Sequence, residues 1–228
     1  MKYGRIIIFG GSSGIGLAAS QFLEPRCEEL ITVSRRPAPH GRWIKTDLSQ
    51  PSEIAALAQA LEGKAVDALL YLGGTWETDA FTLAYDFSTC SDKDLENVLN
   101  INLLAPIRVT QAFLPHLKAA VNARIIVTGA AIAGLSLGGG KEVANTASMI
   151  GLQGMIIGLR QNLQADRIGV TLLKPGYVAT SEVLEDFKAT GISEDYAIPL
   201  QDLMAVIETV LNLSNRTNIN EIEIPTML

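Results

Sequence analysis

The stretch Phe9-Gly10-Gly11-Ser12-Ser13-Gly14-Ile15-Gly16 decides the fold of this chain. It follows a short apolar run, Arg5–Phe9, and precedes a helical pattern that starts at about Ile15. Glycines at this spacing let the backbone turn tightly between a strand and a helix, and they bring amide N–H groups close to a pyrophosphate. A Walker loop would place Lys directly after Gly16, but Leu17 stands there, so a nucleoside-triphosphate site is disfavoured. A glycine-rich turn that binds nothing is the alternative interpretation.

Short apolar runs alternate with helix-length patterns along the whole chain. Strands separated by helices predict a parallel sheet covered on both faces, which is an α/β doubly wound (Rossmann) fold in a single domain over residues 1–228. The expected strands are Arg5–Phe9, Leu30–Val33, Trp43–Lys45, Ala68–Tyr71, Arg124–Val127, Val170–Leu173 and Ile219–Ile224. The expected helices begin at about Ile15 and lie near Ser52–Leu61 and over Asp92–Leu117, Ala147–Gln164 and Pro199–Leu213.

Composition indicates a compact globular protein. Hydrophobic residues make up 48% of the 228 residues and charged residues only 18%, which argues against disordered and fibrous classes. The 24 acidic residues outnumber the 18 basic ones, and the resulting net charge of −6 disfavours nucleic acid and anionic membrane surfaces as partners. Two cysteines and two histidines are too few and too scattered for a Cys/His metal site. We expect Cys27 and Cys90 to be buried and reduced, no segment to span a membrane, and the protein to be cytoplasmic.

Two arginines follow the second expected strand. A cofactor with a free ribose 2′-hydroxyl usually meets an Asp or Glu about 20 residues after the glycine loop, but Arg35 and Arg36 stand near this place. Guanidinium groups form bidentate hydrogen bonds with phosphate, so the sequence favours NADP(H) over NAD(H). Two solvated surface arginines are the alternative. Asp47 and Leu48, just past the third expected strand, are placed to touch the adenine.

In these motifs and their order, the chain resembles the short-chain dehydrogenase/reductase family over nearly its whole length. The family's glycine pattern T-G-x-x-x-G-I-G matches from Gly10 onward, with Phe9 in place of Thr, and Tyr71-Leu72-Gly73-Gly74 occupies the place of its Asn-Asn-Ala-Gly segment. The resemblance implies an apolar contact between Phe9 and Leu72 where the family has a polar one. It also implies a cofactor site made of Gly10, Ser12, Ser13, Gly14, Ile15, Gly16, Arg35, Arg36, Asp47, Leu48, Gly73, Gly74, Pro175, Gly176, Val178 and Thr180.

The family's catalytic side chains are largely missing. Its helix motif Y-x-A-S-K aligns on Asn145-Thr146-Ala147-Ser148-Met149, so Asn145 replaces Tyr and Met149 replaces Lys, while Ala131 falls at the family's Ser. An amide cannot donate a proton at neutral pH and a thioether carries no charge, so the usual mechanism is excluded. Asn102, which matches the family's helix asparagine, remains. Tyr177 is the preferred substitute acid, and the other candidates are Tyr71, Thr128, Lys141 and Lys174.

Two functions remain open. One is an NADP(H)-dependent oxidoreductase of atypical mechanism or weak activity, and the other is a pseudoenzyme, a cofactor-binding sensor or scaffold protein without turnover. The G-x-S-x-G pattern over residues 134–138 would indicate a hydrolase, but no histidine follows it, so this hypothesis is disfavoured. Segments 73–91 and 180–197 should wall a pocket for a largely apolar small molecule. The family resemblance also implies a homodimer or homotetramer.

Overall fold

A computed structural model describes residues 2–130 and 140–227 of the protein. These residues form a seven-stranded sheet in the order β3-β2-β1-β4-β5-β6-β7, in which every neighbouring pair of strands is parallel. The doubly wound α/β fold expected from the alternating pattern is therefore confirmed. The strands are β1 Tyr3–Phe9, β2 Cys27–Ser34, β3 Arg42–Lys45, β4 Ala68–Tyr71, β5 Arg124–Thr128, β6 Gly169–Pro175 and β7 Glu221–Ile224.

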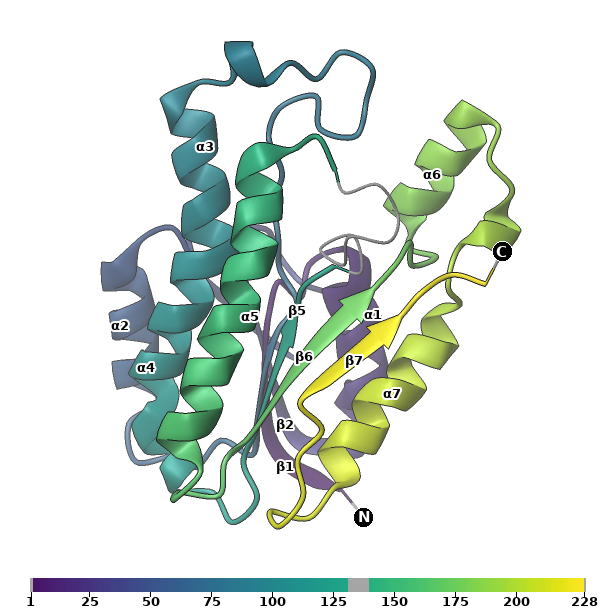
Figure 1. The fold of residues 1–228 in the computed structure, drawn as a ribbon. Helices are drawn as coiled ribbons and strands as arrows, with labels where there is room; N and C mark the ends of the chain where they lie inside the picture. Colours follow the sequence, from purple (N-terminus) through teal and green to yellow (C-terminus); the bar gives the residue numbers. More distant parts are fainter. Residues whose placement is uncertain (1, 131–139, 228) are drawn as a thin grey trace.

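Helices cover both faces of the sheet (Figure 1). The α-helices are α1 Gly14–Leu23, α2 Pro51–Ala60, α3 Asp92–Leu99, α4 Ala105–Lys118, α5 Val143–Leu163, α6 Ser181–Thr190 and α7 Leu200–Asn212. Short 3-10 helices, η1 Glu24–Arg26, η2 Phe87–Thr89 and η6 Glu194–Tyr196, and the π-helical turn η3 Asn100–Leu104 complete the described elements. None of the helices in the described ranges has the length and apolar character that a membrane span requires.

The sheet separates two hydrophobic cores. Side chains of α2, α4 and α5 pack on one face of the strands, and side chains of α1 and α7 pack on the other. Successive residues of β1 alternate between the two cores: Ile7 and Phe9 point to one, and Ile6 and Ile8 to the other. All four are fully buried, as expected of a central parallel strand that is covered on both sides.

The helix predicted over Asp92–Leu117 is interrupted by a turn of π-helix at η3. Pro106, at the start of α4, has no N–H to give to the preceding turn. The backbone widens there, and the Ala105 N–H donates to the carbonyl of Asn100, five residues back. The neighbouring carbonyl of Ile101 accepts a hydrogen bond of 2.6 Å from the Tyr71 hydroxyl instead. A side chain from β4 thus satisfies a carbonyl beside the break, and the turn sets the position of Asn102.

Four further expectations differ from the structure. α5 begins at Val143 rather than Ala147, and α6 was not predicted, although Thr180 caps its first turn and Gly191 ends it with a φ of 72°. The expected contact between Phe9 and Leu72 is wrong, because these side chains belong to opposite cores. Phe9 packs instead on Tyr71 and Phe113, with ring centroids 6.1 and 5.7 Å away. Cys27 is buried as expected, but Cys90 is half-exposed because it ends the surface turn η2.

Candidate functional site

A cavity of about 850 Å³ opens at the carboxyl ends of the central strands. Nearly all residues expected to bind the cofactor line it, together with Asn102, Asn145, Met149 and Tyr177. The exception is Gly16, which lies against the turn itself, where an added Cβ would collide with the carbonyl oxygen of Gly10. Gly16 therefore permits close packing of α1 on the first strand. Ala131 and residues 134–138 lie outside the described residues.

The first turn of α1 forms one end of the cavity. Ser13 is its N-cap residue, but the Ser13 side chain accepts no hydrogen bond from the N–H groups of the turn, and the turn contains no acidic residue. Gly10 and Gly14 adopt left-handed φ values of 94° and 54°, and a Cβ on Gly14 would meet nothing within 4 Å. The helix N-terminus therefore presents N–H groups and its partial positive charge to open space. This is the arrangement that holds a phosphate group.

Arg35 and Arg36 lie on the rim of the cavity beside this helix end. Both are exposed, and Arg36 Nη2 approaches the Ser13 hydroxyl at 3.4 Å. Asp47 also lines the cavity, but its Oδ1 already accepts hydrogen bonds from the backbone N–H and hydroxyl of Ser49. The charge next to the glycine loop is therefore positive.

A buried amide network forms the other end of the cavity. Asn102, only 2% exposed, accepts a hydrogen bond from the Thr75 N–H at Oδ1. Its Nδ2 lies 2.8 Å from the Thr75 carbonyl oxygen, 3.3 Å from Asn145 Oδ1 and 3.2 Å from Ser148 Oγ. The Asn102 side chain thus joins the loop after β4 to the first turn of α5. Asn145 and Met149, one helical turn apart, both border the cavity.

Glu77 also borders the cavity, and no pattern in the sequence pointed to it. It is 3% exposed, and its Oε1 accepts hydrogen bonds from the backbone N–H groups of Ala144 (2.7 Å) and Asn145 (3.1 Å). Its Oε2 is buried without a hydrogen-bond partner in the described part of the chain. The carboxylate therefore caps α5 and explains why that helix begins at Val143. Because this capping side chain lies 67 residues before the helix in the sequence, no local pattern could predict it.

Of the substitute acids considered from the sequence, Tyr177 and Thr128 line the cavity. Tyr177 is 52% exposed and packs edge-on against Phe187 at 5.3 Å. The Thr128 hydroxyl is buried and has no partner among the described residues. Tyr71 does not line the cavity: it is buried, its hydroxyl donates to the Ile101 carbonyl, and burial raises the pKa of its phenol.

The two lysine candidates do not line the cavity. Lys174 forms ion pairs with Glu221 and Glu223 at 3.2 and 3.1 Å, and hydrogen bonds from this ammonium to the two carboxylates raise its pKa. It stays charged between the carboxylates of the edge strand β7. Lys141 is exposed, just before α5. Neither side chain reaches the place where proton transfer would occur.

Aromatic side chains from two segments wall the open side of the cavity. Trp76 and Phe81, which pack edge-on at 6.0 Å, come from the loop after β4, and Tyr177 and Phe187 come from the segment after β6. Asp79 and Phe81 hold left-handed φ values of 58° and 64°, which cost free energy for residues other than glycine. Such strain accumulates at ligand sites more often than elsewhere.

Comparison with known proteins agrees with this fold. The family described as short chain dehydrogenase matches residues 5–190. The 1-hydroxy-2-glutathionyl-2-methyl-3-butene dehydrogenase of Rhodococcus sp. (strain AD45) is 26% identical over 93% of each chain. The short chain dehydrogenase ausX of Aspergillus calidoustus is 28% identical over 83% of this chain and 75% of its own.

Solved structures show the same fold. A putative short chain dehydrogenase of Shigella flexneri 2a, complexed with NADP, superposes with a TM-score of 0.83 and 19% identity over 98% of this chain and 97% of that one. A metagenomic short-chain oxidoreductase in complex with NADP superposes with a TM-score of 0.78 and 21% identity over 100% and 98%. On its sheet order, its glycine turn and the family match over residues 5–190, the chain belongs to the short-chain dehydrogenase family.

Proposed function

We propose that the protein binds NADP(H) in this cavity and acts as an oxidoreductase with an atypical proton-transfer site. The observation that carries the proposal is the uncapped N-terminus of α1 facing the cavity, with Arg35 and Arg36 beside it. The helix end suits the pyrophosphate, and a guanidinium suits a 2′-phosphate. Asp47 and Leu48 would border the adenine, and Pro175, Gly176, Val178 and Thr180 the nicotinamide.

Cofactor preference is tested by titration of NADPH and NADH, followed by protein fluorescence. NADPH should bind more tightly, and replacing Arg35 and Arg36 with Ala should cost about 1–3 kcal/mol of NADPH affinity while leaving NADH nearly unchanged. Arg42→Ala is the matched control, because Arg42 is exposed but pairs with Glu29 away from the cavity. Equal affinities for the two cofactors in the parent protein would overturn the preference.

For proton transfer we propose Glu77, with Tyr177 as the candidate retained from the sequence. A bound nicotinamide supplies or accepts the hydride. Glu77 Oε2 has no partner among the described residues, and the opposite oxygen is bonded to the backbone of Asn145, at the family's tyrosine position. The free oxygen can accept the proton of a substrate hydroxyl and return it in the reverse direction. Asn102 holds this region in place through its hydrogen bonds to Thr75 and Asn145.

An alcohol or its carbonyl product is the proposed substrate class. The Rhodococcus relative is named as a dehydrogenase of a 1-hydroxy compound. The aromatic walls formed by Trp76, Phe81 and Phe187 favour a small molecule with an apolar portion. Turnover is measured with NADP+ and a panel of alcohols, in the parent protein, Glu77→Gln and Glu142→Gln.

Glu142→Gln is the matched control because Glu142 is equally buried and also accepts a backbone hydrogen bond near α5, but does not line the cavity. Glu77→Gln keeps an acceptor for α5 and loses the basic oxygen, so it should lower kcat by about 10²-fold or more. Full activity in Glu77→Gln would refute the proposed base. Tyr177→Phe tests the other candidate in the same assay.

A cofactor-binding protein without turnover is the second candidate. Asn145 and Met149 at the cavity favour it, because neither side chain can act as a proton donor. NADPH binding without oxidation in the presence of every carbonyl tested would support this function. In that case Asn145→Tyr combined with Met149→Lys should introduce measurable reduction of an activated ketone, provided the cavity accommodates both side chains.

A further inference from the structure

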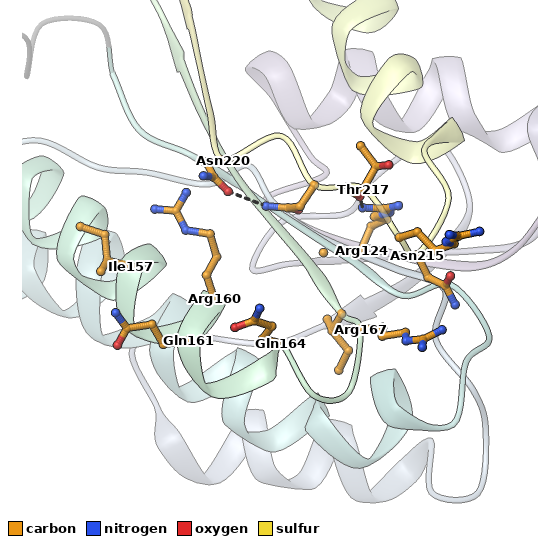
Figure 2. A pocket seen from close by; sticks show the side chains of 13 residues that line it. Arg124, Ile157, Arg160, Gln161, Gln164, Arg167, Asn215, Thr217 and Asn220 are labelled. Atoms are coloured by element: carbon orange, nitrogen blue, oxygen red, sulfur yellow. Dashed lines mark hydrogen bonds between the residues drawn. The ribbon is translucent and has the colours of Figure 1, made fainter.

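A second hollow lies at the opposite end of the sheet. It has a volume of about 630 Å³ and borders Arg124 and Gly169, the first residues of β5 and β6, so it lies beyond the amino ends of these strands. Figure 2 shows its lining side chains, which come from the last turns of α5 on one side and from residues 215–220 on the other. We call it the arginine pocket. Neither the glycine loop nor any proposed proton-transfer residue reaches it.

The lining of the arginine pocket is positively charged. Four arginines border it, Arg124, Arg160, Arg167 and Arg216, together with the amides of Gln161, Gln164, Asn215, Asn218 and Asn220. In the described part of the chain, no Asp or Glu belongs to this lining. Across residues 2–130 and 140–227, no ion pair involves any of these four arginines. Such a concentration of guanidinium groups is unusual on a chain whose net charge is −6.

Among the residues that the structure describes, Arg124 is a buried cation without a counter-ion. It is 1% exposed, and its guanidinium donates to the carbonyl oxygens of Leu213, Ser214 and Thr217 at 2.6, 2.5 and 2.8 Å. Its Nε is buried and has no partner among the described residues. Burial lowers the pKa of this guanidinium, since carbonyl dipoles replace water only in part. An anion in the pocket would supply the missing opposite charge.

Arg167 borders the arginine pocket, and its backbone adopts a strained conformation. Its φ is 55°, in the left-handed region that glycine and asparagine adopt most readily. It stands where the chain leaves α5, and the Ile168 N–H closes the turn on the Leu163 carbonyl at 3.4 Å. A glycine would fit this turn with less strain. The three non-glycine residues with positive φ in the described chain all line one of the two cavities, Asp79 and Phe81 the first and Arg167 the second.

We propose that the arginine pocket binds a small phosphate-bearing molecule with at least two negative charges. Guanidinium groups bind phosphate oxygens in pairs, and the surrounding amides add neutral donors for the remaining oxygens. The volume suits a ligand between pyrophosphate and a nucleotide in size. A nucleic acid strand fits less well, because the rest of the chain is acidic and would repel an extended polyanion. This inference does not depend on the cofactor proposed for the first cavity.

Pyrophosphate is the probe, measured by isothermal titration calorimetry of the full chain at about 50 mM salt. Because the N-terminus of α1 could also hold pyrophosphate, the two sites are separated by variants. Arg160→Ala combined with Arg216→Ala should weaken binding about tenfold or more, since each removes a charge-assisted contact. Arg35→Ala combined with Arg36→Ala should leave this binding in place. Arg108→Ala, on α4, removes a charge of the same sign away from both cavities and is the control for net charge.

Arg167→Gly gives a second, independent readout. Glycine relieves the left-handed backbone, so the variant should unfold at an equal or higher denaturant concentration than the parent while binding pyrophosphate more weakly. Loss of binding in a variant that remains folded cannot come from damage to the fold. The proposal is overturned if the parent binds no pyrophosphate at millimolar concentration. It is equally overturned if binding disappears with Arg35 and Arg36 but survives removal of Arg160 and Arg216.

Discussion

Replacing Glu77 with Ala should destabilise the whole protein, although Glu77 lies in a loop. Its carboxylate accepts hydrogen bonds from two N–H groups of the first turn of α5, at 2.7 and 3.1 Å, and the residue is only 3% exposed. Removal leaves two N–H groups without partners and takes away a negative charge at the helix N-terminus. We expect the free energy of unfolding to fall by about 2–4 kcal/mol, a decrease of roughly 4–16 °C in melting temperature for a chain of this size.

Glu77→Gln separates the hydrogen bonds from the charge. The amide oxygen can still accept from both N–H groups, so only the interaction of the charge with the helix dipole is lost, about 0.5–2 kcal/mol. Urea unfolding followed by circular dichroism measures both variants, with the parent and Glu142→Gln alongside. Glu142→Gln should lose a comparable small amount, because Glu142 Oε1 accepts one hydrogen bond, from the Phe81 N–H at 2.7 Å. An unchanged midpoint in Glu77→Ala would refute the capping role. So would a larger loss in Glu77→Gln than in Glu77→Ala.

Three further outcomes follow from the structure. In the native protein a thiol reagent should modify Cys90 alone, because Cys27 is buried and burial raises its pKa to about 11; Cys90→Ser should then abolish the fast reaction. The Gly41 N–H and the His40 ring, both bonded to Glu24, lower the pKa of that carboxyl, so its contribution to stability is present above its ordinary pKa and disappears as the pH falls through the lowered value. The difference in unfolding free energy between parent and Glu24→Gln should therefore shrink towards pH 3, and a constant difference would contradict the assignment. We propose a homodimer or homotetramer that covers the half-exposed Ile150 of α5, which lines neither cavity; replacing it with Asp should reduce the mass measured by light scattering at micromolar protein, and a monomeric parent would refute this assembly.

Local sequence patterns were sufficient to predict the architecture of the sheet and the helices that cover it. The alternation of apolar runs and helical spacing predicted the strands of the parallel sheet, because burial on both faces demands continuous runs of apolar residues in its central strands. The glycine turn before α1 was equally readable, since only glycines adopt the φ values found at Gly10 and Gly14 without strain. The positions of Asn102, Asn145 and Met149 at one cavity followed from family spacing.

The contacts that shape the cavity join residues far apart in the chain, and local sequence patterns could not predict them. Glu77 meets the first turn of α5 across 67 residues, the Tyr71 hydroxyl reaches the Ile101 carbonyl across 30, and Arg124 ties down a loop some 90 residues further along the chain. The early start of α5 depends on the contact made by Glu77. Arg124, which holds the distant loop, is part of the lining of the arginine pocket. Propensity and periodicity depend only on neighbours within a few turns, whereas a buried polar group is satisfied by whichever side chain the folded sheet brings within about 3 Å of it.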